Sequence, residues 1–209
     1  MPLSPYANAP RLPPSERADA PIDVRALVKG APLELEIGPG PKAGFLVERA
    51  VAAPEAGLIG LEIRRKWATV GDGRLAKQGH AARARVFCED AKSVLPRLSP
   101  AGAFARVFLH FPDPWWKKRH HKRLVMGDLF LAEAARLLAI GGELFVQTDV
   151  DERADLYARA VGSCEAFEPA GDAPGSPRLT ENPYGARSPR EHRAIADGLP
   201  VYRMRWRRR

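Results

Sequence analysis

From residue 33 onward, short apolar segments alternate with segments whose apolar positions recur at helical spacing. Near-continuous apolar runs are typical of strands covered on both faces. We therefore predict strands at 33–37, 58–63, 84–89, 104–111 and 143–149. Helices are predicted between and after them, at 43–53, 64–78, 91–98, 126–139 and 151–162. Gly141 and Gly142 follow the fourth helix as a stop signal.

Strands that alternate with helices of this length indicate right-handed crossovers. The predicted fold class is α/β, with a Rossmann-like, doubly wound, mostly parallel sheet and helices on both faces. Residues 201–206 alternate in polarity and predict an antiparallel edge strand. Residues 169–189 are rich in Pro, Gly and Ser and predict a long loop.

The chain divides into two parts by composition. Residues 1–32 hold seven of the 20 prolines and predict an extended or partly disordered arm, for which a solvated tail is favoured over a part in gripping RNA. Residues 33–209 have a length that suits a single domain.

Several classes of protein are disfavoured by the sequence. Apolar runs are too short to cross a bilayer, and the N-terminus has no apolar segment before a cleavage site. Cys88 and Cys164 are too few for a disulfide framework and lack metal-ligand spacing. We therefore expect a cytoplasmic protein without a membrane partner and without a metal.

The formal net charge of +8 indicates attraction to polyanions, above all nucleic acid. Total charge alone would also fit a role in solubility. The distribution favours nucleic acid, because residues 117–123 contain five Lys or Arg and two His, and residues 201–209 contain five Arg.

Three predicted strands each deliver an acid to the edge of the sheet where ligands bind in such folds. Glu36 precedes a turn with Gly38 and Gly40, Glu62 follows 22 residues after Gly40, and Asp90 follows the third strand. The glycine spacing alone fits a plain strand-to-helix turn equally well, and Asp90 also suits a helix N-cap. Together the acids favour a nucleoside without a diphosphate, such as S-adenosylmethionine, over a nicotinamide cofactor.

The segment 111–123 follows the fourth predicted strand. Pro112 and Pro114 flank Asp113 and fix its backbone, Trp115 and Trp116 follow, and the basic cluster comes next. A rigid loop with a capping Asp and a packed Trp is the structural alternative. The juxtaposition favours a base held at the active site while its phosphates are bound alongside.

On these residues the chain resembles the bacterial tRNA (guanine-N(7)-)-methyltransferase family of class I S-adenosylmethionine-dependent methyltransferases. The resemblance covers most of residues 33–207, and its specific part is the segment 111–123. It implies a seven-stranded sheet with an antiparallel C-terminal strand. It also implies transfer of a methyl group to N7 of guanine 46 in the variable loop of tRNA.

The resemblance also assigns roles to residues. Asp113 is the implied catalytic residue. The implied contacts to S-adenosylmethionine are Glu36, Gly38, Gly40, Glu62, Asp90 and Asp113. The implied substrate contacts are Lys117, Asp149, Ser188 and Glu191, and the residues implied to face RNA are Arg119, His120, His121, Lys122 and Arg123.

Two features depart from the family pattern. Lys42 stands where a glycine is expected, in a turn that is one residue longer. A late Thr-x-x-Glu motif aligns with 188–191, and 180–183 is the alternative alignment.

Guanine N7 carries a lone pair and no proton, so methyl transfer needs no general base and depends mainly on positioning. Asp113 and Asp149 are candidates to stabilise the positive charge that develops on guanine. Asp149 or Glu191 is a candidate to accept hydrogen bonds from the guanine N1–H and exocyclic amine. Rival interpretations are a methyltransferase for exocyclic amines or protein, and an RNA-binding protein without catalysis. A monomer and a homodimer both stay open.

Overall fold

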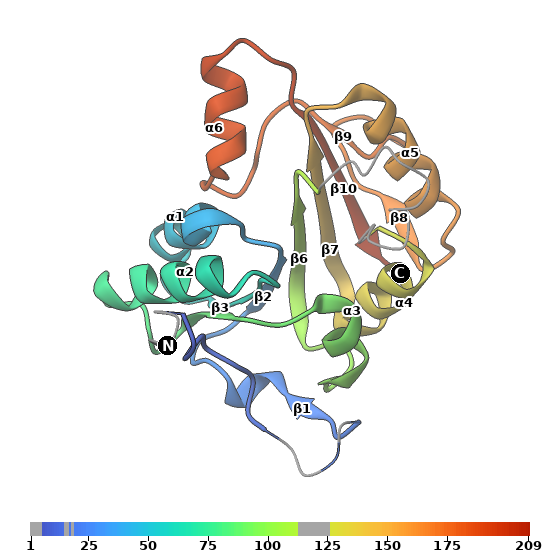
Figure 1. Cartoon of the computed structure of the whole chain (residues 1–209). Helices are drawn as coiled ribbons and strands as arrows, with labels where there is room; N and C mark the ends of the chain where they lie inside the picture. The colour runs from blue at the N-terminus through green and yellow to red at the C-terminus, as the bar shows by residue number, and fades with distance from the viewer. Residues whose placement is uncertain (1–5, 15–16, 18, 113–125) are drawn as a thin grey trace, which may run out of the picture.

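The computed structural model describes residues 6–14, 17, 19–112 and 126–209. Within them an eight-stranded sheet has the order β4-β3-β2-β6-β7-β10-β8, and β9 pairs with β10 beside this path (Figure 1). The first five strands of this order are parallel. The strands are β2 (Leu33–Ile37), β3 (Gly57–Leu61), β4 (Ala84–Phe87), β6 (Phe104–His110), β7 (Leu138–Thr148), β8 (Phe167–Pro169), β9 (Arg178–Leu179) and β10 (Tyr202–Arg208).

Helices cover both faces of the sheet (Figure 1). One apolar cluster joins a sheet face to α3 (Ala91–Val94), α4 (Asp128–Leu137) and α5 (Asp151–Gly162). A second cluster joins the other face to α1 (Gly44–Ala52), α2 (Arg65–Lys77) and part of the segment before α6 (Pro189–Ala196). The prediction of a doubly wound α/β fold with a mostly parallel sheet and an antiparallel C-terminal strand is therefore confirmed.

Two predictions about the sheet need correction. It has eight strands among the described residues rather than seven, and two of them, β8 and β9, form short pairs with β10. For the same reason β10 is not an edge strand: it lies between β7 on one side and β8 and β9 on the other. Trp206 is fully buried as a result. Strands of two or three residues give no periodicity that a sequence pattern could reveal.

The strand β7 begins at Leu138, earlier than the predicted start at residue 143. Leu138 pairs with Phe104, and the pairing then shifts so that Glu143 lies opposite Arg106. Gly141 (φ 75°) lies within this irregularity, where a left-handed backbone favours glycine. The glycines expected to end the helix therefore lie inside the strand, and α4 ends at Leu137.

The described part of the N-terminal segment is packed against the rest of the chain. Strand β1 (Ile22–Asp23) pairs with β5 (Leu98–Ser99), and a 3₁₀ turn, η1 (Val24–Ala26), follows it. Leu12, Val24 and Val28 are buried in the same apolar cluster as the sheet. These residues do not lie as a solvated tail, because their apolar side chains are buried in that cluster. The division of the chain at residue 33 stays a prediction.

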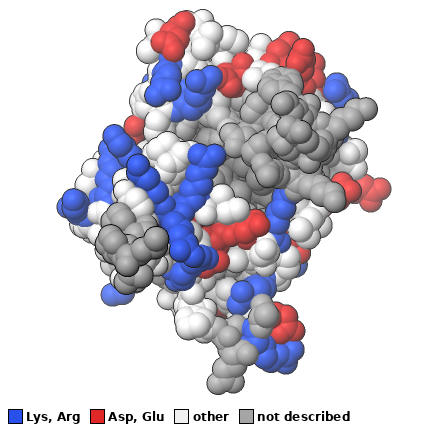
Figure 2. Space-filling view, viewed as in Figure 1, with Lys and Arg blue, Asp and Glu red and all other residues white. Residues whose placement is uncertain are grey.

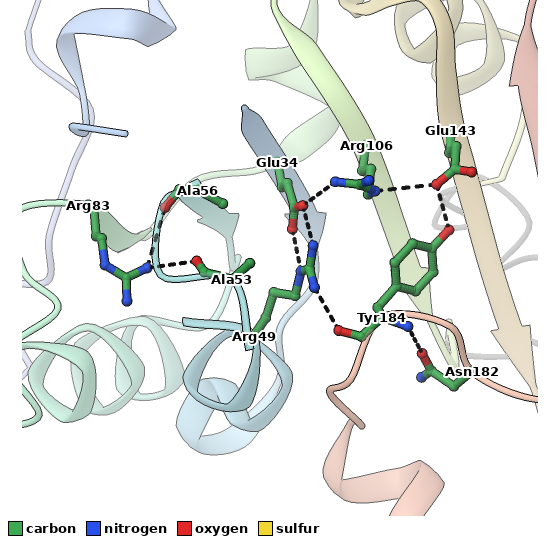
Figure 3. Close-up of polar contacts among 9 residues, drawn as sticks. All are labelled: Glu34, Arg49, Ala53, Ala56, Arg83, Arg106, Glu143, Asn182 and Tyr184. Carbon is green, nitrogen blue, oxygen red and sulfur yellow. Dashed lines mark hydrogen bonds and ion pairs between the residues drawn. The ribbon is translucent and has the colours of Figure 1, made fainter. Parts of the chain in front are cut away.

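A buried ion-pair network supports the sheet face that α1 covers (Figure 3). Glu34 of β2 accepts hydrogen bonds from Arg49 of α1 and from Arg106 of β6. Arg106 also contacts Glu143 of β7, whose carboxylate accepts a hydrogen bond from the Tyr184 hydroxyl at 3.2 Å. Burial raises the pKa of Tyr184, and the adjacent Glu143 raises it further, so this phenol stays protonated and donates. The network fixes the segment before α6 on the sheet.

Candidate active site

Five parallel strands end at one edge of the sheet, and their following residues meet there. The glycine turn follows β2, Glu62 follows β3 and Asp90 lies beyond β4. Phe111 follows β6 and Asp149 follows β7. Because the carboxyl ends of parallel strands are where ligands bind in this kind of sheet, this edge is the candidate site.

The glycine turn has a backbone that few other residues adopt. Gly38 and Gly40 both have φ of 68°, and a Cβ added at Gly38 would meet no atom within 4 Å. The turn therefore borders open space that a ligand can enter close to the backbone. Lys42 (φ 69°) and Ala43 (φ 46°) continue in left-handed conformations inside the short 3₁₀ turn η2 (Pro41–Ala43).

Glu62 is tied to this glycine turn. Its carboxylate accepts hydrogen bonds from the backbone N–H of Gly40 at 3.0 Å and of Arg64 at 2.9 Å. Burial raises the pKa of Glu62, and these two backbone hydrogen bonds oppose the rise. Each carboxylate oxygen keeps a second lone pair, so the group can still accept from two vicinal hydroxyls of a ribose.

Glu36, a second buried acid near the glycine turn, is directed toward β6. Its Oε1 lies 2.8 Å from Nδ1 of His110, and both side chains are buried. Its Oε2 is buried and has no hydrogen-bond partner among the residues that the structure describes. A buried carboxylate oxygen without a partner indicates a place for a donor from a ligand.

Asp90 is exposed and caps α3 by accepting a hydrogen bond from the Lys92 backbone N–H at 3.0 Å. Helix capping is the alternative role that the sequence allows for Asp90, and the structure shows this capping hydrogen bond. A carboxylate can cap a helix and still accept from a ligand through its other oxygen. The predicted cofactor contact of Asp90 therefore stays a prediction.

Asp149 lies at the end of β7 and is paired with Arg190 of α6. The Arg190 guanidinium donates to Asp149 Oδ2 from Nε at 2.8 Å and also from Nη2. This ion pair holds the N-terminal turn of α6 against the sheet edge, beside the acid for which a guanine contact is predicted.

The two alternative alignments of the late substrate motif lie in contact with each other. Ser188 caps α6 by accepting from the Glu191 backbone N–H at 3.1 Å. Glu191 is fully buried, and its carboxylate accepts from Asn182 at 2.9 Å and from Arg203 Nε at 2.9 Å. In this arrangement Glu191 anchors α6, and its predicted substrate role, like that of Ser188, stays a prediction.

The remaining predicted residues fall outside the described ranges. Phe111 (φ 45°) is near the last described position before the gap, and its backbone N–H donates to the Gln147 carbonyl at 2.8 Å. The residues for which a role is predicted but no position is described are Asp113, Lys117, Arg119, His120, His121, Lys122 and Arg123.

The hydrogen-bond acceptors at this edge fit S-adenosylmethionine. That molecule carries a ribose, an ammonium group and a sulfonium, and the edge offers Glu62 at the glycine turn and the unpaired Oε2 of Glu36. In the described ranges no group of three His, Cys, Asp or Glu could hold a metal ion. Cys88 and Cys164 are both free thiols. Over the same part of the chain, no helix has the length and apolar character to cross a membrane.

Comparisons with known proteins identify the family. A family model described as "Putative methyltransferase" matches residues 30–204. A tRNA (guanine-N(7)-)-methyltransferase of Anaeromyxobacter dehalogenans is 42% identical over 179 residues, covering 84% of this chain and 85% of the relative. The chain belongs to the tRNA (guanine-N(7)-)-methyltransferase family. Another relative of that name, from Myxococcus xanthus, is 36% identical over 83% of this chain and 82% of its own length.

Solved structures support the fold of this family member. TrmN from Thermus thermophilus aligns with a TM-score of 0.60 at 17% identity, over 89% of this chain and 47% of that one. The 16S rRNA methyltransferase KamB aligns with a TM-score of 0.58 at 14% identity, over 88% and 90%. At such identities the likeness concerns the fold alone, which is that of S-adenosylmethionine-dependent methyltransferases.

Sequence reasoning gave no role to several side chains that contact predicted site residues, among them Arg203, which contacts Glu191. His110 contacts Glu36 and Arg190 contacts Asp149. For His110 the usable signal was a polar residue among the apolar residues near the end of the predicted strand 104–111. Arg190 gave no signal, because one arginine among many in a basic chain is not distinctive.

Proposed function

We propose that this chain transfers the methyl group of S-adenosylmethionine to N7 of a guanine in tRNA, namely guanine 46 of the variable loop. The observation that carries the proposal is the 42% identity to a tRNA (guanine-N(7)-)-methyltransferase over 84% of the chain. It acts in the cytoplasm, as a monomer or a homodimer.

The cofactor supplies an electrophilic methyl group on a sulfonium. On the protein side, Glu62 would accept hydrogen bonds from the ribose hydroxyls, and the hydrogen bond from the Gly40 N–H holds its carboxylate at the glycine turn. Gly38 leaves the backbone open to the ligand. Asp90 and Asp113 complete the cofactor contacts.

The guanine side depends on positioning rather than on proton transfer. N7 has an in-ring lone pair and no proton, so holding it in line with the methyl group provides most of the acceleration. Asp149 accepts from the guanine N1–H and exocyclic amine, and with Asp113 it stabilises the positive charge that reaches the ring. Lys117, Ser188 and Glu191 complete the substrate contacts.

The target base must leave its stack, and Trp115 or Trp116 stacks on it or on a neighbouring base. Phosphates are bound by residues 119–123. At the start of α2, Arg64, Arg65 and Lys66 are exposed and would also attract phosphates. Figure 2 shows Lys and Arg side chains gathered over the part of the molecule where α1 and α2 lie. Such a concentration of positive charge suits a surface that binds a polyanion.

The test is incubation with labelled S-adenosylmethionine and unmodified tRNA, followed by nucleoside analysis. We expect 7-methylguanosine, and none with a tRNA in which guanine 46 is replaced by adenine. Label on an exocyclic amine or on protein would instead support the rival methyltransferase. Binding of tRNA without binding of S-adenosylmethionine in calorimetry would support a protein without catalysis.

A further inference from the structure

His110 ends β6, and its side chain lies beside the cofactor edge. Its Nδ1 is 2.8 Å from Oε1 of Glu36, which precedes Gly38 of the glycine turn by two positions. The two side chains are 3% and 1% exposed, so water does not compete for this contact. Nothing in the proposed reaction uses this histidine, because N7 methylation needs no base.

The imidazole of His110 is held in a fixed orientation by aromatic rings. Its centroid lies 4.3 Å from that of Phe45 and 5.8 Å from that of Phe145. Phe108 stacks on it with an interplanar angle of 16° at 5.7 Å. A ring enclosed in this way cannot rotate away from Glu36, so the direction of its Nδ1 is set by packing on α1, β6 and β7.

This contact determines which oxygen of Glu36 is available. A carboxylate only accepts, so Nδ1 of His110 carries the hydrogen and donates to Oε1. Oε2 has no partner among the described residues and is buried. A buried, charged acceptor needs a donor, and a cationic donor matches it best.

Of the two positive groups of S-adenosylmethionine, only one can satisfy this oxygen. The sulfonium has no hydrogen to donate, whereas the α-amino group has three N–H bonds and a full charge. Glu62, on the neighbouring strand, is held at the glycine turn by the Gly40 N–H and suits the ribose instead. The ammonium of the amino-acid portion is therefore the donor that fits Glu36.

We propose that His110 is a positioning residue that holds Glu36 Oε1, so that Oε2 accepts a hydrogen bond from the α-amino group of the cofactor. This inference rests on the proposed use of S-adenosylmethionine. His110 acts through Glu36 and touches neither the methyl group nor guanine.

The test compares three variants of His110 in the full chain. In His110→Asn the amide nitrogen falls near the position of Nδ1 and can still donate to Glu36. In His110→Gln the amide nitrogen falls near the position of Nε2 and cannot donate to Glu36. His110→Phe keeps an aromatic ring but has no hydrogen-bond donor. Calorimetry measures binding of S-adenosylhomocysteine, which has the amino group, and of 5′-methylthioadenosine, which lacks the amino-acid portion.

We expect S-adenosylhomocysteine to bind His110→Asn within about threefold of wild type. Binding to His110→Gln and His110→Phe should be about tenfold weaker or more, the usual loss for a hydrogen bond to a charged group. All three variants should bind 5′-methylthioadenosine as wild type does. In a Glu36→Gln background, His110→Gln should cause little further loss, because the two residues act as one unit.

Different failures are distinguishable. If wild type binds neither ligand, the proposed function fails. If wild type binds S-adenosylhomocysteine and His110→Gln and His110→Phe bind it equally well, the positioning role is overturned. A role in packing alone predicts that His110→Asn loses the most affinity, and for both ligands, since it fills the aromatic enclosure least. Should His110→Phe fail to fold, the comparison of Asn with Gln still decides the question.

Discussion

Arg49 of α1 donates two hydrogen bonds to Glu34 of β2, from Nε at 2.8 Å and from Nη2 at 2.7 Å. Its Nη1 donates a third, at 2.6 Å, to the backbone carbonyl of Tyr184. One buried guanidinium thus joins the first strand of the domain, the first helix and the segment that leads into α6. Together with the Asp149–Arg190 ion pair, this contact holds α6 and the segment before it against the sheet.

Arg49→Met should lower the free energy of unfolding by about 3 kcal/mol, because it leaves the buried Glu34 carboxylate with fewer partners. Arg178→Met is the matched control, since it removes an exposed ion pair with Asp155 and should cost less than about 1 kcal/mol. Urea unfolding of both variants measures the difference. Equal losses would contradict the role given to the buried pair.

Gly71 and Gly73 lie in the same helix and should respond oppositely to alanine. A Cβ at Gly71 would come within 2.8 Å of the Ala43 Cβ in the turn η2, whereas one at Gly73 meets nothing within 4 Å. Gly71→Ala should cost about 1–3 kcal/mol and weaken S-adenosylmethionine binding. Gly73→Ala should stabilise by about 0.5–1 kcal/mol and leave binding unchanged. Thermal unfolding and calorimetry on both variants check this.

Glu62→Gln should alter stability in a pH-dependent way. Burial raises the pKa of Glu62 in the folded chain, so its contribution to stability is present below the unfolded pKa and is lost as pH rises through the folded value. The free energy of unfolding of the variant, relative to wild type, should therefore increase as pH rises from about 4 to 7. Urea titrations at several pH values measure this slope.

The same substitution should weaken S-adenosylmethionine binding at pH 7, since an amide offers the ribose only one accepting atom. A flat difference in stability across the pH range would mean that burial does not govern this carboxyl group.

Asp149→Ala should lower kcat/KM for guanine methylation by about 10²-fold, because it removes a group that acts on the charge developing on the base. Preference for guanine should be lost, while calorimetric affinity for S-adenosylmethionine stays as in wild type. Arg190→Ala is the control: it removes the partner of Asp149 but keeps the carboxylate, so guanine preference should persist. Full activity of Asp149→Ala would rule out the assignment.

Neutralising four cations of the basic cluster should weaken tRNA binding most strongly at low salt. The slope of log K against log salt concentration should become shallower by about 3, since each lost phosphate contact contributes about 0.7–0.9. Filter binding at several salt concentrations gives the slope, and S-adenosylmethionine affinity is the control. Unchanged binding at low and high salt would contradict the phosphate contacts. The residues changed are Lys118, Arg119, Lys122 and Arg123.

Much of the fold could be read from local pattern. The strand at 33–37 and the helix at 151–162 have their predicted bounds. An apolar run reflects a strand buried on both faces, and apolar residues at helical spacing reflect a helix buried on one face. The acids Glu36 and Glu62 lie at the predicted edge of the sheet, since every parallel strand in such a fold delivers its carboxyl end to the same side.

The sequence by itself therefore determined the five parallel strands and the helices between them, the edge of the sheet where ligands bind and, through residues 111–123, the resemblance to the family. Tertiary structure alone decided which side chains meet there. Glu36 meets a histidine 74 positions away, and Asp149 meets an arginine 41 positions away. Such pairs leave no periodicity in the chain, because they arise from the register of β2 against β6 and from the packing of α6 on the sheet. The inner position of β10 has the same origin: its partners β8 and β9 are too short to be recognised until they pair.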